Sequence, residues 1–289
     1  MSYNLFMPDT NAAIHFLNGE LITEKDLNIS IRDLGFTRGY AVFDFLITYP
    51  HHRPFMLSKH IDRLFNSASL IGLSIPWSKE QISEWISKTL DANKDEAEKA
   101  IKIIISGGVA DSLIPTATST IAILVDPRHT FPQEYYEKGI AVVTAKHNRY
   151  EPLAKSNNYI EGVKQAQVAA QAGAIDPIYY DDQQVLESST SNVFAVINNK
   201  LLTPKSNILP GITRGVLLSI LKLDIPIAEE DFKLEDLLSA QEVFLSASNK
   251  EVMAVTKIDG KAVGDGTVGP ITKEAMRQFK AFVLSNSWE

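Results

Sequence analysis

The 289-residue sequence contains no cysteine, which excludes disulfide bonds and thiolate metal sites. It also has no apolar run close to the ~20 residues that a transmembrane helix needs, so we expect no membrane partner. Lysine and arginine number 28 against 35 aspartates and glutamates, which gives a net charge of −7. Because no basic patch dominates, we expect no nucleic-acid partner.

Several catalytic signatures are also missing. The sequence lacks the patterns G-x-S-x-G, G-x-x-x-x-G-K-[ST] and H-E-x-x-H, and its six histidines show no ligand spacing, so we expect no metal. Its first residues, MSYNLFMPDTNAAIHFLNGE, carry no basic segment followed by a long apolar core, so we expect no signal peptide. The absence of cysteine is compatible with a reducing compartment, and we expect a cytoplasmic protein.

Strand and helix patterns alternate along the sequence. Residues 14–21 predict a hairpin whose turn is Asn18-Gly19, a favoured pair for two-residue turns. Short apolar runs predict strands at 41–49, 101–106, 119–125, 140–145, 177–180, 193–197, 242–246 and 253–258. Helical spacing predicts helices at 57–73, 78–90, 158–172, 213–221 and 272–285. Such interleaving favours an α/β or α+β fold.

Two local signals refine this outline. Ser78 and Gln81 have the spacing of a capping box, so we expect the second helix to begin there. Residues 126–133 interrupt the pattern with two prolines. We therefore expect an interdomain linker at 126–133, between a domain of residues 1–125 and a domain of residues 134–289.

Two short segments carry groups that suit one cofactor. Lys155 lies just before a helix of small residues, and Glu187 lies at the end of a strand, ahead of a run of hydroxyls and Asn192. A lysine amine forms Schiff bases with aldehydes. A carboxylate can hold a pyridine nitrogen in its protonated form, and together these groups predict pyridoxal 5'-phosphate. A single lysine is more often only a solvated surface charge.

Three further segments could bind the phosphate of such a cofactor. Thr213 is placed as the N-cap of a helix, whose free amides favour anions, although ordinary capping also explains it. The segment Leu245–Asn249 ends a strand in small hydroxyl residues that could equally form a polar turn. His60, Arg63 and Ser67 share a helix face, which could hold a phosphate through Arg63 or simply be solvated.

Arg38 is a cation among aromatic residues, in a glycine-containing segment that leads into a strand. Its guanidinium could bind the carboxylate of a substrate. It could equally form an ion pair with Asp33 or Asp44.

Seven blocks of sequence, in chain order, resemble the class IV aminotransferases, which are the fold-type IV pyridoxal phosphate enzymes. They run from Phe16 to about Val255 and read LNG, RDLGFTRGYAVFDF, KHIDRLFNSASLIGL, KSNNYIEGVKQAQVAAQAGA, VLESSTSNVFAV, TPKSNILPGITRG and VFLSASNKEV. The family includes branched-chain aminotransferases, D-amino-acid aminotransferases and 4-amino-4-deoxychorismate lyases. The resemblance implies a small N-terminal α/β domain, a larger C-terminal pseudo-barrel domain with the cofactor between them, and a homodimer.

The resemblance also implies a role for individual residues. Lys155 would hold the cofactor as a Schiff base and move a proton during the reaction. Glu187 would bind the pyridinium nitrogen, Tyr159 would approach the phenolic oxygen of the cofactor, and Asn192 would order the loop. The phosphate would be bound by Arg63, Ile212, Thr213 and Ser248.

The candidate substrate-binding residues are those at which the sequence departs from familiar members. Phe36 stands where many members carry a tyrosine, and Arg38 replaces an apolar residue. Some D-amino-acid transaminases of the family use an arginine in this loop for the substrate carboxylate. A second arginine would be expected where Lys102 stands, and residues 106–110 match the branched-chain signature poorly.

These implications favour a transaminase that moves an amino group from a D-amino acid to a 2-oxo acid. A branched-chain L-amino-acid aminotransferase is the first alternative. A 4-amino-4-deoxychorismate lyase, which eliminates pyruvate, would need a roomier and more cationic pocket around residues 106–118. A protein that carries the cofactor without catalysis is a further alternative, against which the intact Lys155 and Glu187 argue.

Overall fold

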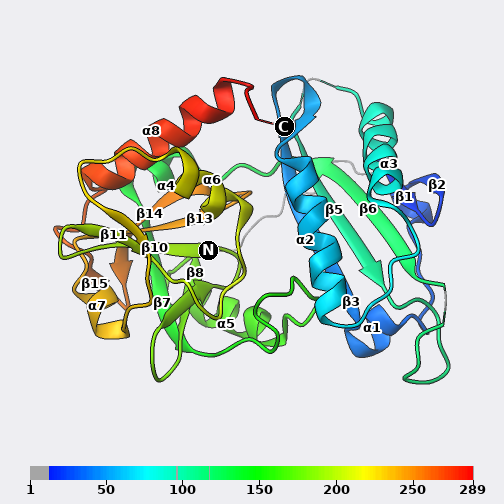
Figure 1. Cartoon of the computed structure of the whole chain (residues 1–289), viewed down its shortest axis with the longest axis horizontal. Helices are drawn as coiled ribbons and strands as arrows, with labels where there is room; N and C mark the ends of the chain where they lie inside the picture. The colour runs from blue at the N-terminus through cyan, green and yellow to red at the C-terminus, as the bar shows by residue number, and fades with distance from the viewer. Residues whose placement is uncertain (1–12, 96, 117, 289) are drawn as a thin grey trace. The chain divides into compact units, whose positions relative to one another are not determined.

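The computed structural model describes residues 13–95, 97–116 and 118–288. Their contacts divide into two compact units, in both of which strands and helices mix (Figure 1). Unit 1 holds the described residues up to His129 together with residues 154–158, and unit 2 holds Thr130–Leu153 and Tyr159–Trp288. Most of the segment examined for a signal peptide lies outside the described residues. The division into two independent domains joined by a linker at 126–133 stays a prediction.

The sheet of unit 1 has six strands and is antiparallel throughout. In spatial order they are β2 (Glu20–Thr23), β1 (Ile14–Leu17), β6 (Thr120–Pro127), β5 (Lys99–Ser106), β3 (Ala41–Tyr49) and β4 (Arg53–Pro54). Along β5, Ile101, Ile103 and Ile105 are buried while Lys102 between them is exposed, so one face of this strand lies in the core.

Two helices pack on the sheet of unit 1, α2 (Leu57–Leu70) and α3 (Lys79–Ala92) (Figure 1). Leu64 of α2 and Ile82 and Ile86 of α3 are fully buried at helical spacing against the isoleucines of β5. The predicted capping box is confirmed, because Ser78 and Gln81 exchange side-chain hydrogen bonds with each other's backbone. The shorter helices of unit 1 are η2 (Glu24–Asp26), α1 (Leu34–Arg38) and η3 (Pro50–His52).

Unit 2 is built on a nine-stranded mixed sheet. Eight strands follow the order β12 (Ile227–Glu229), β11 (Lys200–Thr203), β10 (Asn192–Ile197), β13 (Glu242–Ala247), β14 (Glu251–Ile258), β7 (Ile140–Lys146), β8 (Asp176–Tyr180) and β9 (Val185–Ser188). The ninth, β15 (Lys261–Ala262), pairs with β14. The last strand, β9, also contacts β10 near the other end of the order, so the sheet curls into a half-barrel. Every residue of β10 is buried, as expected for a strand covered on both faces.

Five helices belong to unit 2: α4 (Gln133–Lys138), α5 (Ile160–Gln171), α6 (Ile212–Ile220), α7 (Leu234–Leu238) and α8 (Pro270–Leu284). Helix α8 packs on β13 and β14, and α6 packs on α8 and β13 (Figure 1). The carboxylate of Glu242 accepts hydrogen bonds from the first-turn amides of Ile271 and Thr272 in α8. A carboxylate is favoured there because it lies at the positive end of the helix dipole.

The predicted elements are present in the described residues, with shifted ends. The strand predicted at 119–125 extends to Pro127, the helix predicted at 57–73 ends at Leu70, and that predicted at 158–172 begins at Ile160. One local prediction is wrong: Thr213 is the second residue of α6, and the N-cap is Gly211. Short elements such as α4, α7 and β12 have too few residues for a periodic pattern and were not predicted.

Candidate active site

Lys155 is held by the main chain of unit 1. Its carbonyl accepts a hydrogen bond from Phe43 N (2.9 Å), and Asn157 N donates to Ala41 O (3.0 Å), so residues 155–157 pair with the start of β3. The amide of Lys155 donates to the hydroxyl of Ser67 on α2 (3.0 Å). Its ammonium lies 4.5 Å from the centre of the Phe43 ring. Lys155 is therefore a partly buried lysine with a fixed backbone, not a solvated surface charge.

The face of α2 that carries His60, Arg63 and Ser67 is turned to the interior of unit 1. His60 and Ser67 are fully buried, which excludes the alternative of a solvated basic face. Arg63 donates through Nε (2.9 Å) and Nη2 (2.8 Å) to the two carboxylate oxygens of buried Asp44 on β3. This bidentate pair orients the guanidinium and leaves its Nη1 without a partner among the residues described.

Asp44, His60 and Arg63 form a charge-balanced group. Burial raises the pKa of Asp44, but the opposing effects of Arg63 and His60 hold that pKa well below its usual range. Burial, together with the nearby cations Arg63 and Lys155, lowers the pKa of His60 against the opposing effect of Asp44. His60 is therefore neutral near pH 7 and donates its Nδ1 proton to Asp44 (2.6 Å).

Glu187 in unit 2 is surrounded by hydrogen-bond donors. Arg149 donates to its Oε1 through Nε (2.8 Å) and lies 2.7 Å away through Nη2. The amide of Leu209 (3.1 Å) and the side chain of Asn192 (3.4 Å) donate to Oε2. Glu187 is buried, and its two carboxylate oxygens together accept from all these donors. The arrangement can therefore hold a protonated ring nitrogen at Oε2, where it would replace the long hydrogen bond from Asn192.

Asn192 donates hydrogen bonds both to Glu187 and to the segment that precedes α6. Its Nδ2 also donates to Leu209 O (2.9 Å), and a Cβ on Gly211 would lie only 1.9 Å from its Oδ1. The absence of a side chain at Gly211 thus lets the first amides of α6, those of Ile212 and Thr213, approach the Glu187 loop. These amides have no partner within the helix and favour an anion. Ser248 comes directly after the last residue of β13. Ser246, two residues earlier, lies opposite Asn192 in the sheet.

Two buried hydroxyls near these groups have no hydrogen-bond partner among the residues described. They belong to Ser188, which follows Glu187, and Ser246. Because buried polar groups are normally satisfied, these unpartnered hydroxyls are consistent with a polar ligand. Together with the first amides of α6, they make unit 2 chemically compatible with a phosphorylated pyridine such as pyridoxal 5'-phosphate.

The candidate substrate residues lie in unit 1, apart from one another in the sequence. Arg38 ends α1, is exposed, and donates only to the neighbouring Thr37 carbonyl (2.8 Å). The predicted alternative of an ion pair is wrong, because the Asp44 carboxylate bonds Arg63 and His60. Likewise, the Asp33 carboxylate accepts from Gly35 N and from two hydroxyls of the sheet.

The surroundings of three further predicted residues do not assign them a role; these residues are Phe36, Lys102 and Tyr159. Phe36 is 66% exposed. Lys102 is an exposed residue of β5 whose charge acts on Asp126, and none of the described contacts joins it to Arg38. Tyr159, at the N-cap of α5 in unit 2, packs over Gly162, where an added Cβ would lie 3.1 Å from its ring.

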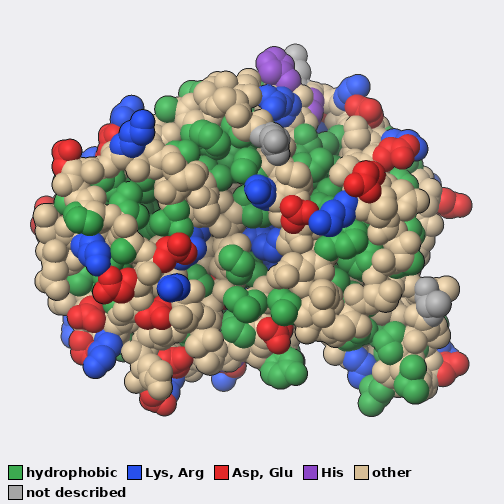
Figure 2. Space-filling view, in the orientation of Figure 1, with side chains coloured by type: hydrophobic (Ala, Val, Ile, Leu, Met, Phe, Trp, Pro, Cys, Tyr) green, Lys and Arg blue, Asp and Glu red, His purple; other side chains and the backbone are tan. Residues whose placement is uncertain are grey.

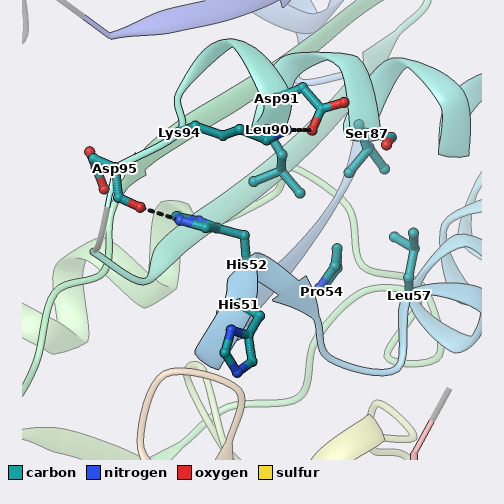
Figure 3. Close-up of a pocket in the computed structure, with 10 residues that line it drawn as sticks. His51, His52, Pro54, Leu57, Ser87, Leu90, Asp91, Lys94 and Asp95 are labelled. Atoms are coloured by element: carbon teal, nitrogen blue, oxygen red, sulfur yellow. Dashed lines mark hydrogen bonds and ion pairs between the residues drawn. The ribbon is translucent and has the colours of Figure 1, made fainter.

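A separate pocket of about 670 Å³ lies within unit 1 (Figure 3). His51, His52 and Pro54 line one side, and residues of α3 such as Leu90 line the other. The ring of His52 bonds the Asp95 carbonyl. None of the predicted site residues lines this pocket, so we assign it no part in the chemistry of Lys155.

Comparison with known proteins identifies the family of the chain. The family model described as "Amino-transferase class IV" matches residues 41–258. D-alanine aminotransferase of Staphylococcus aureus (strain COL) is 33% identical over 279 residues, which cover 94% of this chain and 98% of that protein. The chain is a class IV aminotransferase. It is therefore a transaminase, and its cofactor is the pyridoxal phosphate of the family, as the sequence predicted.

Solved structures confirm the fold-type IV architecture of this transaminase. The branched-chain amino acid aminotransferase of Escherichia coli superposes with a TM-score of 0.87 at 27% identity, covering 94% of this chain and 95% of that one. The branched-chain aminotransferase of Thermoproteus uzoniensis, solved with norvaline, also gives a TM-score of 0.87, at 26% identity, covering 95% of this chain and 96% of that one.

Sequence reasoning missed two residues of the site. Arg149 supplies the ion pair to Glu187, and Asp44 orients Arg63. The only sequence signal for Asp44 was a charged residue within an otherwise apolar strand, which a buried partner explains. Arg149 lies in a segment without periodicity, and nothing in the sequence pairs it with Glu187. Among the described residues no group of side chains could hold a metal ion.

Proposed function

We propose that this transaminase takes its amino group from D-amino acids and that Arg38 binds the carboxylate of the donor. The observation that carries the proposal is the guanidinium of Arg38, which has no carboxylate partner in the described part of the chain. It lines a pocket of about 310 Å³ together with Arg32, Thr37 and Leu113. A planar guanidinium is suited to a bidentate carboxylate contact. The similarity to a D-alanine aminotransferase supports the same donor class.

We assign to the cofactor those residues whose side chains or amides suit its phosphate or its ring nitrogen. Pyridoxal phosphate, once bound, supplies a carbonyl carbon that accepts amino groups and a ring that withdraws electrons. In unit 1, Arg63 is the candidate phosphate ligand through its free Nη1. In unit 2, the candidate phosphate ligands are the amides of Ile212 and Thr213 and the hydroxyl of Ser248. Glu187 would keep the proton on the ring nitrogen.

Lys155 would do the proton transfer of the reaction. The hydrogen bonds of its main chain to β3 and Ser67 leave only the side chain to move. Its Nζ would take the proton from the α-carbon of the donor. It would then deliver a proton to the carbon that was the carbonyl carbon of the cofactor. Neutral His60 and the ion-paired Asp44 and Arg63 bring no net charge to this part of unit 1.

We further propose that the enzyme is a cytoplasmic homodimer. Hydrophobic side chains cover the tip of the segment between β5 and β6, where Leu113 and Ile114 are each 77% exposed (Figure 2). Others gather over α5 and the loop before it, including Ile160 and Tyr150 (Figure 2). Exposed apolar patches of this kind mark protein interfaces. No helix among the described residues is long and apolar enough to cross a membrane.

The experiment that tests the donor is a comparison of kcat/KM for D-alanine and D-glutamate with L-leucine and L-isoleucine. We expect the D-donors to be preferred. Arg38→Ala should then raise KM for the D-donors by roughly tenfold or more, the scale of a charged hydrogen bond. Arg32→Ala is the matched control, because Arg32 lines the same pocket but is already paired with Asp111 (2.8 Å).

Two other outcomes would redirect the assignment. If the L-donors win and Arg38→Ala leaves them unaffected, the branched-chain alternative holds. Release of pyruvate from an aminated chorismate-type substrate, without a requirement for a 2-oxo acid acceptor, would instead identify a lyase.

A further inference from the structure

Lys250 is a buried lysine that the proposed chemistry does not use. It lies in the turn between β13 and β14 and is 4% exposed. Its ammonium lies 3.1 Å from Asp176 Oδ2, 2.7 Å from Thr190 Oγ1 and 3.1 Å from Ser191 Oγ. An ammonium has three protons, and each of these contacts takes one. Lys250 therefore has no proton left with which to bind a phosphate directly.

The hydroxyl run after Glu187 is committed to the same group. Ser189 and Thr190 both donate to the carboxylate of Asp176, which begins β8 and is itself buried. Thr190 thus donates to Asp176 while it accepts from Lys250. The three hydroxyls of Ser189, Thr190 and Ser191 therefore form a closed network around one ion pair.

This network joins three segments of unit 2. They are the loop between β9 and β10, the turn that follows β13, and the start of β8. The first segment, residues 189–191, begins two residues after Glu187 and ends just before Asn192, while the second contains Ser248. A buried ion pair whose remaining hydrogen bonds are all satisfied fixes its neighbours strongly, because no member can move without leaving a charge unpaired.

We propose that Lys250 is a positioning residue for cofactor binding. Paired with Asp176, it locks the loop of residues 188–192 to the turn of residues 247–250, and so holds Glu187, Asn192 and Ser248 in the places where they meet the cofactor. The inference rests on the proposed function, since it assumes that these three residues bind pyridoxal phosphate. It assigns Lys250 no contact with the cofactor or with the substrate.

The test measures the dissociation constant of pyridoxal phosphate on the apoenzyme, by equilibrium titration of cofactor absorbance and without turnover. Two variants are compared with the unmodified chain: Lys250→Met, and Lys250→Met combined with Asp176→Asn, which leaves no unpaired buried charge. Both should weaken cofactor binding by about tenfold, as loss of an outer partner of a ligand does. Lys99→Met is the matched control, because Lys99 is equally buried and paired with Asp95 in unit 1.

Amide exchange separates positioning from general stability. In the two Lys250 variants, exchange should rise in residues 188–192 and 247–250 and stay unchanged in α8 and β14 beyond the turn. Unchanged cofactor affinity in a folded double variant, or exchange that rises uniformly through unit 2, overturns the positioning role alone. Failure of the unmodified chain to bind pyridoxal phosphate overturns the proposed function, and this inference with it.

Discussion

At the scale of single residues, the surroundings of Glu187 explain its role best. A guanidinium on one oxygen and a main-chain amide on the other favour the ionised form of the carboxylate. An ionised carboxylate beside a ring nitrogen favours its protonated form, which is the form that withdraws electrons from the reacting carbon. Arg149 would therefore contribute indirectly to the proposed role of Glu187, because its ion pair orients that carboxylate.

Glu187→Gln should lower the half-reaction rate much more than it lowers cofactor affinity. The lost charge-assisted hydrogen bond is worth ~1.5–3 kcal/mol. That difference corresponds to about ten- to more than a hundredfold in rate, at ~1.4 kcal/mol per decade. Stopped-flow measurement of the reaction with one donor, without acceptor, isolates this step. Glu229→Gln removes a carboxylate paired with another buried arginine, Arg214, and should leave the rate near that of the unmodified enzyme.

A half-reaction rate in Glu187→Gln close to that of the unmodified enzyme would exclude Glu187 as the partner of the ring nitrogen.

The residue identities of this site illustrate what a sequence can provide. Lys155 and Glu187 are predictable from the sequence because few other residues supply their side-chain chemistry. Arg149 and Asp44 act by meeting a partner that is distant in the sequence, so only the fold reveals them.

At the scale of the element, α2 connects the proposed phosphate ligand Arg63 to the core of unit 1. Its apolar stripe, which includes Leu64, packs on the sheet, and the same orientation turns Arg63 towards Asp44 and Ser67 towards Lys155. The helix therefore positions both a proposed phosphate ligand and the backbone of the proposed catalytic lysine.

Arg63→Ala should weaken pyridoxal phosphate binding by about 1.5–3 kcal/mol, the scale of a charged hydrogen bond. Excess cofactor should restore part of the activity, because the proton transfer lies with Lys155. The measurement is the cofactor dissociation constant together with the rate at saturating cofactor. Arg128→Ala is a suitable control, since Arg128 is a similarly buried arginine of unit 1 that pairs with Glu98 (2.5 Å).

Unchanged cofactor affinity in Arg63→Ala would place the phosphate away from α2.

The helix itself was predictable from spacing, because Ile61, Leu64 and Ala68 recur on one face and are all buried. The start of α6 was not predicted correctly. Threonine is a frequent N-cap, but here Gly211 takes that position because a side chain would collide with Asn192.

At the scale of the whole molecule, the sequence indicated alternating strands and helices but not the order of the strands. That order depends on long-range pairings, such as the parallel pairing of β7 with β14, more than a hundred residues later. Periodicity reports only which residues face a core, and many orders satisfy the same pattern. The family resemblance, not the periodicity, supplied the half-barrel.

The proposed homodimer gives a prediction at this scale. Light scattering on the enzyme should give about twice the 32.0 kDa mass of the chain. Replacing both Leu113 and Ile114 with aspartate should shift this mass towards that of a monomer, because buried unpaired charges oppose association. Leu284→Asp is the control, since Leu284 is also exposed, at 63%, but lies on α8 outside both patches. A monomeric enzyme with full activity would contradict the proposal.

The central claim is that Lys155 carries the cofactor of this transaminase. It is tested most directly by reducing the holoenzyme with borohydride, digesting it, and identifying the labelled peptide by mass spectrometry. The claim predicts a pyridoxyl group on Lys155, and no stable label in Lys155→Ala even where that variant still binds the cofactor through its phosphate. A label on any other lysine, Lys250 included, or an unmodified Lys155 in active enzyme, would contradict it.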